Sequence, residues 1–407
     1  MNIALSTSVI QRGKTGVAQY IFSLVKTLCR FAREHQFTLF VLEEDLPLFT
    51  FAESFAKIVP VPERFRPPMK NILWHQSHLP ALIQEQRIDV LHVPSYRRLL
   101  WPKPCALVAT IHDLAPFHIA NKYDWKRMLY GRVIVKRLTR RQDEIIAISE
   151  NTASDITRFF GTPREKISVV YNGLDHERFF PDSQLAAKKF ITQQHGINAP
   201  FFLYLARLEH PGKNHVRLVE AFNQFKAETK SNWHLVFGGS DWHGAEAIHE
   251  KIARSPFAKD IHSLGFVSSE DLPALYRAAD VFVYPSLYEG FGLPPVEAMA
   301  SGCPVISSKR GSLGEVVGDA AMIIDPENIS DLKRQMGILA TNPKLRDEMR
   351  EAGFVRAEFF NWEKTAEETF KVYSRAFERQ KGYTAKQVGA HPLPVTSGKT
   401  DSPSGNN

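Results

Sequence analysis

The sequence predicts an α/β protein built from two Rossmann-like, doubly wound domains. Short apolar runs alternate with amphipathic helical patterns, which is typical of a parallel sheet covered by helices. Glycine-containing loops follow several of these runs, as they do where ligands approach the carboxyl ends of parallel strands. The alternation begins a second time near residue 200, and 407 residues are enough for two domains of ordinary size.

The first series of elements occupies residues 1–175. Residues 2–9 are expected to form the first strand, followed by a glycine loop at 11–16 and a helix over 17–31 whose apolar residues recur at helical spacing. Helical patterns also cover 79–86 and 149–160, the second capped by Ser149 or Asn151. Further strands are predicted at 37–42, 56–59, 90–93, 106–111, 143–148 and 167–171.

The second series occupies residues 176–361, and we place the domain boundary near 173–180, after the turn signal Asn172-Gly173. Its strands are predicted at 201–206, 234–237, 261–264, 280–284, 304–307 and 321–324. A helix over 362–378 closes the ordered chain. Residues 380–407 are rich in Gly, Pro, Ser, Thr and Lys, so we expect a disordered tail.

The bulk composition indicates a cytoplasmic globular protein. Hydrophobic residues make up 43% and charged residues 23% of the chain, and no run of 18 apolar residues predicts a transmembrane helix. The three cysteines are isolated in apolar settings and suggest neither a disulfide framework nor a zinc site. The net charge of +7 is compatible with a nucleotide, a membrane or a nucleic acid and does not choose among them.

Residues 285–302 are the most informative stretch. They follow the apolar run 281–284 and contain two glycines, two prolines and a helical pattern over 295–300, which Gly302 ends. The free amides and positive dipole end of such a loop–helix junction form an anion site. Glu289 before the loop and Glu297 in the expected first turn are placed to accept hydrogen bonds from the hydroxyls of a sugar or ribose.

Glu289 and Glu297, with seven residues between them, match the E-x7-E motif of retaining GT-B glycosyltransferases. The wording around them, EGFGLPPVEAMASGCPVI, resembles glycosyltransferase family 4. The resemblance covers about 1–378 and is strongest from about 200 to 325. It implies a GT-B fold whose last helix crosses back to the first domain. It also implies retaining transfer of a glycosyl group, with mannosyl as one candidate, from a nucleotide-diphosphate sugar to a glycan or lipid-linked acceptor in polysaccharide biosynthesis.

Arg207 and Lys213 flank the carboxyl end of the strand predicted at 201–206. Two fixed cations there could clamp a diphosphate, and the pair resembles the Arg and Lys of family 4 that grip the donor. With the amides of Phe291, Gly292 and Leu293, they would stabilise the charge that develops on the leaving diphosphate. The resemblance assigns the ribose hydroxyls to Glu297 and the donor sugar to Glu289.

Three further donor contacts are predicted. His112 ends the strand at 106–111, where a lone histidine is commonly structural, but the resemblance to the family's His-Asp segment indicates a contact with the donor sugar. Gly238 ends the strand at 234–237 and lets a ligand approach the backbone, unless it only forms a tight turn. Val267 lies in a segment that resembles the nucleobase contact of the family.

Gly13 and Gly16 belong to a loop that allows two interpretations. Lys14 and Thr15 after Gly13 resemble part of a P-loop, but Ser8 stands where that motif has its first glycine. The family resemblance instead implies a glycine loop beside the donor phosphates, with the acceptor nearby.

Residues 126–141 form a basic helical pattern in which Arg132, Lys136 and Arg140 recur every four residues. Leu129, Val133 and Ile134 form an apolar face that we expect to pack in the core, leaving a solvated basic side. The alternative is peripheral contact with the inner membrane surface or with a lipid-linked acceptor. No nucleic-acid partner is expected, since no aromatic platform or recognition motif accompanies the run.

We expect no cofactor and no metal, because the chain lacks the D-x-D motif that holds a divalent metal in GT-A enzymes. Two alternatives remain open. A nucleotide-sugar epimerase or hydrolase of the same fold would need acid–base carboxylates in the first domain, where only Asp113 and Asp124 are candidates. A binding protein without turnover would keep the same donor residues.

Overall fold

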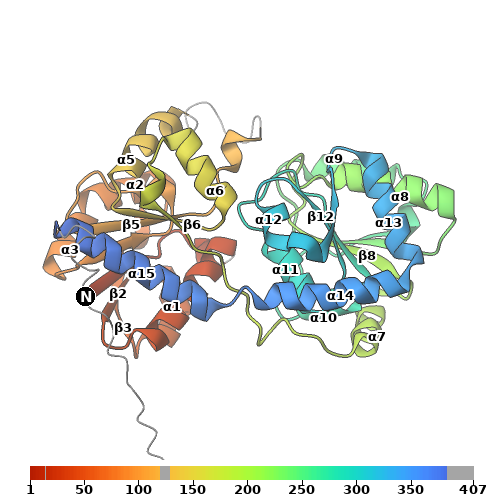
Figure 1. Ribbon diagram of the computed structural model, residues 1–407, viewed down its shortest axis with the longest axis horizontal. Coiled ribbons are helices and arrows are strands. Elements are labelled where there is room, and N and C mark those ends of the chain that lie inside the picture. The colour runs from red at the N-terminus through yellow and green to blue at the C-terminus, as the bar shows by residue number, and fades with distance from the viewer. Residues whose placement is uncertain (14, 120–128, 383–407) are drawn as a thin grey trace, which may run out of the picture.

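The computed structural model describes residues 1–13, 15–119 and 129–382, which form two parallel β-sheets, each covered by helices (Figure 1). The strand order is β3-β2-β1-β4-β5-β6-β7 in the first sheet and β10-β9-β8-β11-β12-β13 in the second. Neighbouring strands are parallel in both sheets. The predicted class of two doubly wound, Rossmann-like domains is confirmed.

The strands of the first sheet are β1 Asn2–Ser6, β2 Gln36–Leu42, β3 Ala56–Val61, β4 Val90–Val93, β5 Ala106–Ile111, β6 Glu144–Ala147 and β7 Ile167–Val169. The strands of the second are β8 Phe201–Leu205, β9 His234–Gly238, β10 Ile261–Ser263, β11 Val281–Tyr284, β12 Val305–Ser308 and β13 Ala321–Ile324. Every residue of β4, β5, β8, β11 and β12 is buried. Helices on both faces of a parallel sheet produce this burial, which is why these strands are continuous apolar runs in the sequence.

The first domain contains α1 Gly16–Phe31, α2 Pro68–Ser77, α3 Leu79–Glu85, α5 Lys136–Arg141 and α6 Glu150–Asp155. The second contains α7 Gln184–His195, α8 His215–Thr229, α9 Ala245–Ala253, α10 Leu272–Ala278, α11 Leu293–Ala300, α12 Leu313–Val317, α13 Ile329–Thr341 and α14 Pro343–Glu358. The last helix, α15, spans Trp362–Gln380.

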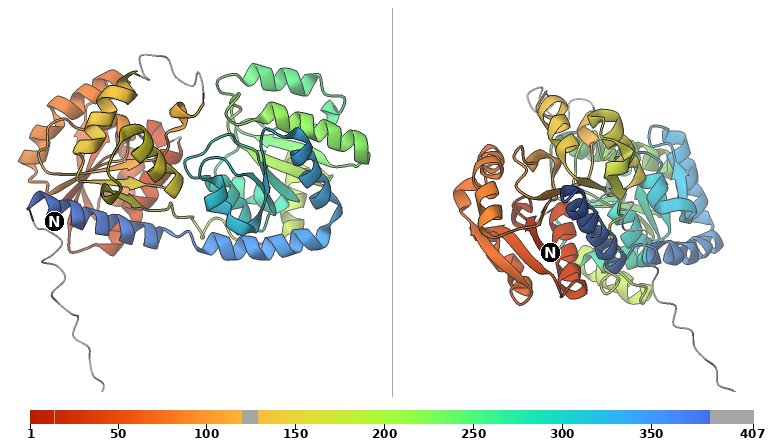
Figure 2. Two further views of the ribbon diagram at one scale, coloured as in Figure 1. Left: turned by 45° about the horizontal axis from the view of Figure 1, so that its top comes forward. Right: turned by 60° about the vertical axis from the view of Figure 1, so that its left-hand side comes forward.

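Helix α15 returns from the second domain and lies along the first (Figures 1 and 2). Its residues Ala366, Val372, Tyr373 and Ala376 are buried in the core cluster that also holds Ile21 of α1. The crossing helix predicted from the family resemblance is therefore present. The predicted disordered tail falls almost wholly on 383–407, outside the described residues, and the boundary at 175/176 stays a prediction.

The two segments that connect the domains lie against each other. The amide of Leu174 donates to the carbonyl of Phe360 over 3.2 Å, and Leu174 forms a parallel bridge with Asn361. A Cβ atom on Gly173 would lie 2.5 Å from the backbone nitrogen of Trp362. Only glycine allows this approach, so the predicted turn at Asn172-Gly173 is also the crossing point of the two connections.

Three local predictions are wrong in detail. The first strand ends at Ser6 rather than near residue 9, because the amide and hydroxyl of Thr7 both bond the carbonyl of Phe40 and the chain then turns. Helix α6 ends at Asp155, and a single π-helical turn continues it to Phe160, although Ser149 caps its start as predicted. Helix α11 starts at Leu293, so Glu297 stands beyond its first turn.

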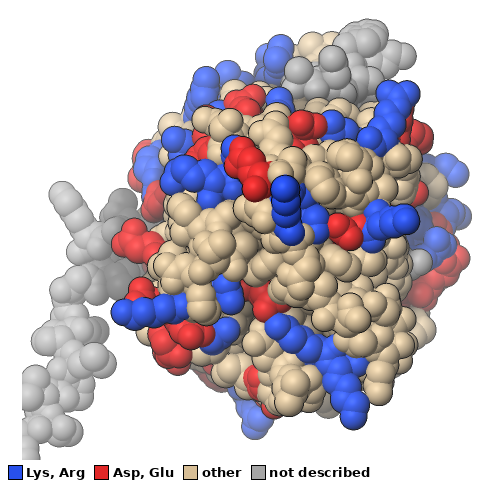
Figure 3. Space-filling view, turned by 90° about the vertical axis from the view of Figure 1, so that its right-hand side faces the viewer, with Lys and Arg blue, Asp and Glu red and all other residues tan. Residues whose placement is uncertain are grey.

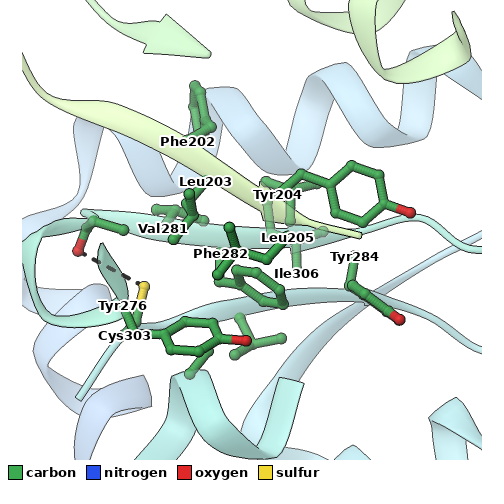
Figure 4. Packing of buried hydrophobic residues seen from close by; sticks show 14 of the residues in the cluster. Phe202, Leu203, Tyr204, Leu205, Tyr276, Val281, Phe282, Tyr284, Cys303 and Ile306 are labelled. Atoms are coloured by element: carbon green, nitrogen blue, oxygen red, sulfur yellow. Dashed lines mark hydrogen bonds between the residues drawn. The ribbon is translucent and has the colours of Figure 1, made fainter. Parts of the chain in front are cut away.

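The core of the second domain supports its ligand-facing edge. Figure 4 shows the apolar side chains of strands β8, β11 and β12 packed together, among them Phe202, Leu203, Val281, Phe282 and Ile306. The hydroxyls of Tyr204 and Tyr284 point away from this core at one side. The outer end of this domain carries interspersed Lys, Arg, Asp and Glu side chains, and no patch of a single sign covers that face (Figure 3). Both hydroxyls bond residues of the cleft between the domains.

Candidate active site

A cleft of about 890 Å³ lies between the two domains. Residues after the carboxyl ends of strands line it, as expected for ligand sites in open α/β sheets. From the first domain come Gln11, Thr15, Gly16, Val17, His112, Asp113 and Ile119, and from the second Arg207, Glu209, Lys213, Trp242, Glu289, Phe291, Gly292 and Leu293, among others. Eight of the twelve predicted site residues therefore line one cavity.

Lys213 and Glu289 form a partly buried ion pair at the centre of this cleft, with Nζ and Oε1 2.6 Å apart. The same carboxylate oxygen accepts from the Ser286 hydroxyl at 2.6 Å and from the Tyr284 hydroxyl at 3.1 Å. Burial raises the pKa of Glu289, but the charge of Lys213 and these hydrogen bonds outweigh it, and the pKa lies below its usual value. Glu289 is thus ionised, and its Oε2 bonds no described residue.

Two buried tyrosines of the core hold this pair in place. The Tyr204 hydroxyl donates to the carbonyl of Lys213 over 2.6 Å, and the Tyr284 hydroxyl donates to Glu289. Burial, with the nearby charge of Glu289, raises the pKa of both hydroxyls well above 10, so both remain donors. Figure 4 shows the two hydroxyls on the same side of the core. The positions of Lys213 and Glu289 therefore depend on packed strands, which gives a precise site.

Arg207 reaches the cleft with its guanidinium 4.7 Å from the ring centre of Trp242. Its side chain is 52% exposed, and its distance of 3.8 Å to Glu209 describes a weak ion pair. The stacking on Trp242 orients the fork of donors without consuming them. Arg207 and Lys213 thus supply two cations to one cleft, as their spacing predicted.

The loop–helix junction offers backbone donors. Gly292 has a φ of 100°, a conformation that strains other residues, and a Cβ there would lie 2.5 Å from Leu313. Pro294 and Pro295 carry no N–H, so the available amides are those of 290–293, and none of the four donates to a described residue. Free amides beside two cations are the features of an oxyanion site.

His112 enters the cleft from the first domain as a neutral imidazole. Burial lowers its pKa to about 4, while a hydrogen bond with the backbone of Pro94 acts in the opposite direction. Its Nε2 is buried and has no partner among the described residues, and the ring packs edge-on against Tyr20, 4.8 Å between centres. The Nε2 atom of this neutral ring is thus left as an unpartnered acceptor in the wall of the cleft.

Four predicted residues do not line the cleft. Gly13, with a φ of 80°, packs against Leu48 and Phe22 beside it, and Lys14 lies outside the described residues. A Cβ on Gly238 would lie 2.5 Å from Leu205 and 2.8 Å from Val267, so Gly238 and Val267 pack against each other. The carboxylate of Glu297 accepts from the Tyr276 hydroxyl at 2.8 Å, and burial raises its pKa.

Several cleft residues were missed by the sequence analysis, Trp242 and His243 among them. Both follow the carboxyl end of β9, so the rule that identified Arg207 and Glu289 could have identified them too. Asn172 lines the cleft as well, although its sequence signal indicated only a turn. The predicted site residues were chosen because they are glycines in loops or carry charge. An aromatic residue in a loop belongs to no sequence motif that marks it as a site residue.

The first domain holds the segment around Glu289 from both sides. The Tyr288 hydroxyl donates to Asp155 of α6 over 2.5 Å, and the ring of Tyr288 stacks on His118, 4.4 Å between centres. On the other side, the Ser149 hydroxyl donates to the carbonyl of Gly290 over 2.9 Å. The orientation of the Glu289 backbone thus depends on contacts that exist only when the domains are together. We call this set of contacts the interdomain clasp.

A second part of the clasp joins α6 to α12. The carboxylate of Glu315 accepts from the amides of Glu150 at 2.7 Å and Asn151 at 3.1 Å, the first amides of α6. An anion at a helix N-terminus is favourable. A Cβ on Gly290 would lie 1.9 Å from the carbonyl oxygen of His112, so the domains touch where Glu289 and His112 approach each other.

The described part of the basic segment, 129–141, contradicts the expectation that its apolar face packs in the core. Leu129 is 54%, Val133 42% and Ile134 41% exposed, and the buried side is made by Gly131, Val135, Leu138 and Thr139. Arg132, Arg137 and Arg140 are exposed beside the apolar residues. The helical pattern was correct, but a different arc of it faces the core.

The part of the chain that the structure describes shows neither a metal-binding cluster nor a membrane-spanning helix. No group of three or more His, Cys, Asp or Glu side chains in these ranges could hold a metal ion. No described helix has both the length and the apolar character required to span a bilayer.

Comparison with known proteins agrees with the predicted family and fold. The chain is 28% identical over 391 residues to the O-antigen chain mannosyltransferase B of Escherichia coli, covering 92% of this chain and 99% of that protein. It is 32% identical over 286 residues to the MMP alpha-(1->4)-mannosyltransferase of Mycolicibacterium hassiacum, covering 67% and 66%. The structure resembles HepE of Anabaena, solved in complex with UDP and glucose, with a TM-score of 0.72 at 19% identity over 92% of this chain and 99% of that one.

Two family models match consecutive parts of the sequence. The model described as Glycosyltransferase Family 4 matches residues 14–178, and the model described as Glycosyl transferases group 1 matches residues 187–356. Together they cover strands β2 to β13 and every residue that lines the cleft except Gln11. The chain therefore belongs to glycosyltransferase family 4 and is a glycosyltransferase of the GT-B fold.

Proposed function

We propose that this enzyme transfers a glycosyl group, with mannose as the first sugar to test, from a nucleoside-diphosphate sugar to a glycan or lipid-linked acceptor in polysaccharide biosynthesis. The observation that carries the proposal is the convergence of Arg207, the Lys213–Glu289 pair and the four free amides of 290–293 on one interdomain cleft. Mannose comes first because the relative that covers 92% of this chain is named a mannosyltransferase.

Each of these cleft residues has a role in breaking the bond to the donor sugar. The bond between the anomeric carbon and the diphosphate oxygen breaks, and negative charge develops on the leaving diphosphate. The anomeric carbon bonds to an oxygen of an acceptor hydroxyl, whose proton passes to the departing diphosphate. Arg207, Lys213 and the 290–293 amides stabilise that charge, and each donor of this kind contributes on the order of 3 kcal/mol. The ionised Glu289 accepts from a donor-sugar hydroxyl through Oε2, and His112 accepts from another through Nε2.

We further propose that transfer retains the anomeric configuration and needs no divalent metal. The family resemblance supports retention. Two cations and four backbone donors support metal independence, because they already supply positive charge where the diphosphate leaves. The one-bond carbon–proton coupling at the anomeric centre of the product tests retention, because it distinguishes the two anomers even for mannose. Full activity in EDTA supports metal independence, and activity restored only by Mg²⁺ or Mn²⁺ contradicts it.

The decisive experiment incubates the purified protein with a panel of nucleotide sugars, with and without membrane-extracted acceptors, and analyses products by mass spectrometry. A glycosylated acceptor supports transfer. An epimer or free sugar without acceptor supports the alternative enzymes, and binding without product supports a non-catalytic protein. Of the two carboxylates that an epimerase or hydrolase would need, Asp113 accepts from the amide of Ala115 at 3.0 Å, and Asp124 lies outside the described residues.

We also propose that residues 129–141 contact the cytoplasmic membrane surface, where a lipid-linked acceptor would be presented. Leu129, Val133 and Ile134 can insert at the interface while Arg132 and Arg137 meet anionic headgroups. Sedimentation with vesicles containing phosphatidylglycerol should deplete the protein from solution, and vesicles of pure phosphatidylcholine should not. Charge reversal at Arg132 and Arg137 that leaves sedimentation unchanged would refute this contact.

A further inference from the structure

One arginine of the first domain is partly buried without an anionic partner. Arg98 ends a short 3-10 turn, Tyr96–Arg98, that follows the carboxyl end of β4. Its Nε donates to Oδ1 of Asn71 at 2.6 Å, and no described carboxylate pairs with its guanidinium. Burial lowers the pKa of Arg98; Tyr130 raises it, and the adjacent Arg97 lowers it further. A desolvated cation without a counter-ion is unfavourable in a folded protein.

Another arginine of the same domain, Arg66, forms ion pairs with carboxylates. Arg66 is 20% exposed and lies 3.1 Å from Asp45, which is itself 1% exposed, and it also bonds Glu63. These partners raise the pKa of Arg66 well above its usual value. Arg98 has no such carboxylate partner among the described residues.

The surroundings of Arg98 are polar but not acidic. Asn71, which accepts from Arg98, also accepts from the Ser8 hydroxyl at 3.2 Å. His75 bonds the carbonyl of Asn71 through Nδ1 at 2.8 Å and the Ser6 hydroxyl through Nε2 at 2.9 Å. Burial lowers the pKa of His75 to about 3, so this histidine stays neutral. The network fixes the Arg98 side chain and leaves its positive charge uncompensated.

This cluster lies at the ligand-binding edge of the first sheet. Strands β1, β4 and β5 are neighbours, and Ser8, Arg98 and His112 follow their carboxyl ends. The backbone of Pro94, four residues before Arg98, bonds His112 of the cleft. Arg98 therefore stands on the first domain, whereas the proposed donor cations Arg207 and Lys213 stand on the second.

We propose that Arg98 is part of an anion-binding subsite for a phosphate-type oxyanion carried by the acceptor, bound through the two guanidinium nitrogens that bond no described residue. A guanidinium binds such an oxyanion in a bidentate manner. The subsite rests on the proposed function in one respect, that the oxyanion belongs to the acceptor. It makes phosphorylated or diphosphate-linked acceptors the substrate class to test first.

The test titrates the full-length protein with inorganic pyrophosphate by calorimetry. We expect two classes of site, one weakened by Lys213→Gln and the other by Arg98→Gln. Loss of a charged donor should weaken the second class by about tenfold to hundredfold, and Arg98→Lys should retain part of the binding. Arg66→Gln is the matched control, which should keep both classes but lower the melting temperature, whereas Arg98→Gln should leave that temperature unchanged or raise it.

The outcomes separate this subsite from the donor site and from a membrane. If Arg98→Gln keeps both classes, or lowers the melting temperature as Arg66→Gln does, the subsite does not exist. If Lys213→Gln removes nothing while Arg98→Gln still acts, the donor-site assignment fails and the subsite stands. If Arg98→Gln leaves the pyrophosphate titration intact but abolishes sedimentation with phosphatidylglycerol vesicles, the oxyanion is a lipid headgroup and the acceptor proposal is overturned.

Discussion

Replacing Lys213 by Met tests the electrostatics of the cleft. Lys213 keeps the pKa of Glu289 below its usual value despite burial, and it supplies one of two cations to the leaving diphosphate. Met fills a similar volume without charge. The substitution therefore removes a transition-state contact and also leaves the Glu289 carboxylate with only the hydroxyls of Ser286 and Tyr284.

The loss of rate and the loss of stability in Lys213→Met can both be given a magnitude. Removing one donor to a developing oxyanion lowers the rate roughly 10²- to 10³-fold, about 3 kcal/mol. Breaking a fully buried ion pair destabilises by about 3–5 kcal/mol. The side chains of Lys213 and Glu289 remain 18% and 16% exposed, so we expect the lower part of that range at pH 7.

The sign of the pH dependence follows from Glu289. Its folded-state pKa is lowered in the wild type, so its contribution is present at neutral pH and is lost only as the pH falls through that lowered value. In Lys213→Met, the carboxylate of Glu289 is buried without a cation, so burial raises its pKa. The free-energy cost of this buried charge falls as Glu289 becomes protonated. The stability difference between the two proteins should therefore narrow between pH 7 and pH 5.

Initial rates with the donor identified by the sugar panel, and melting temperatures at both pH values, measure these effects. Lys188→Met is the matched control, because Lys188 bonds Asp280 at 2.7 Å in the same domain and does not line the cleft. It should lose some stability and keep its rate. A Lys213→Met enzyme that turns over within threefold of the wild type would refute the reasoning.

Three further predictions concern the contact between the domains. Tyr288→Phe removes the hydrogen bond to Asp155, and kcat should fall about tenfold with little change in donor affinity; an equal loss of affinity would contradict a positioning role. Gly290→Ala places a Cβ 1.9 Å from the carbonyl oxygen of His112, so small-angle scattering should show a more open molecule, and an unchanged profile would contradict the tight contact. His112 has a pKa of about 4, so nuclear magnetic resonance should show no titration of its ring between pH 5.5 and 8, and an inflection near 6.5 would contradict its burial.

Much of the fold could be predicted because burial on both sheet faces makes strands easy to recognise. Strands β4 and β5, which are buried throughout, have the predicted bounds. The donor-side site could be predicted for a related reason. Lys213 and Glu289 are 76 residues apart, yet both follow the carboxyl ends of neighbouring strands, β8 and β11, and such ends meet at one edge.

The interdomain clasp could not be predicted in the same way. Tyr288 and Asp155 belong to different domains, and no periodicity in either half of the chain reports how the halves meet. The prediction for the basic segment was wrong for another reason. An amphipathic pattern predicts a helix, but this helix has apolar residues on two faces, one with Leu129 and Val133 and one with Val135 and Leu138. The sequence does not show which face packs in the core, and the structure buries the second.

The central claim is that the interdomain cleft holds a donor diphosphate between Arg207, Lys213 and the 290–293 amides. A crystal structure with a bound nucleoside diphosphate tests it most directly. We predict the terminal phosphate within hydrogen-bond distance of Arg207 and Lys213, with the 290–293 amides directed toward it. A diphosphate bound elsewhere, or one that contacts neither cation, would contradict the account.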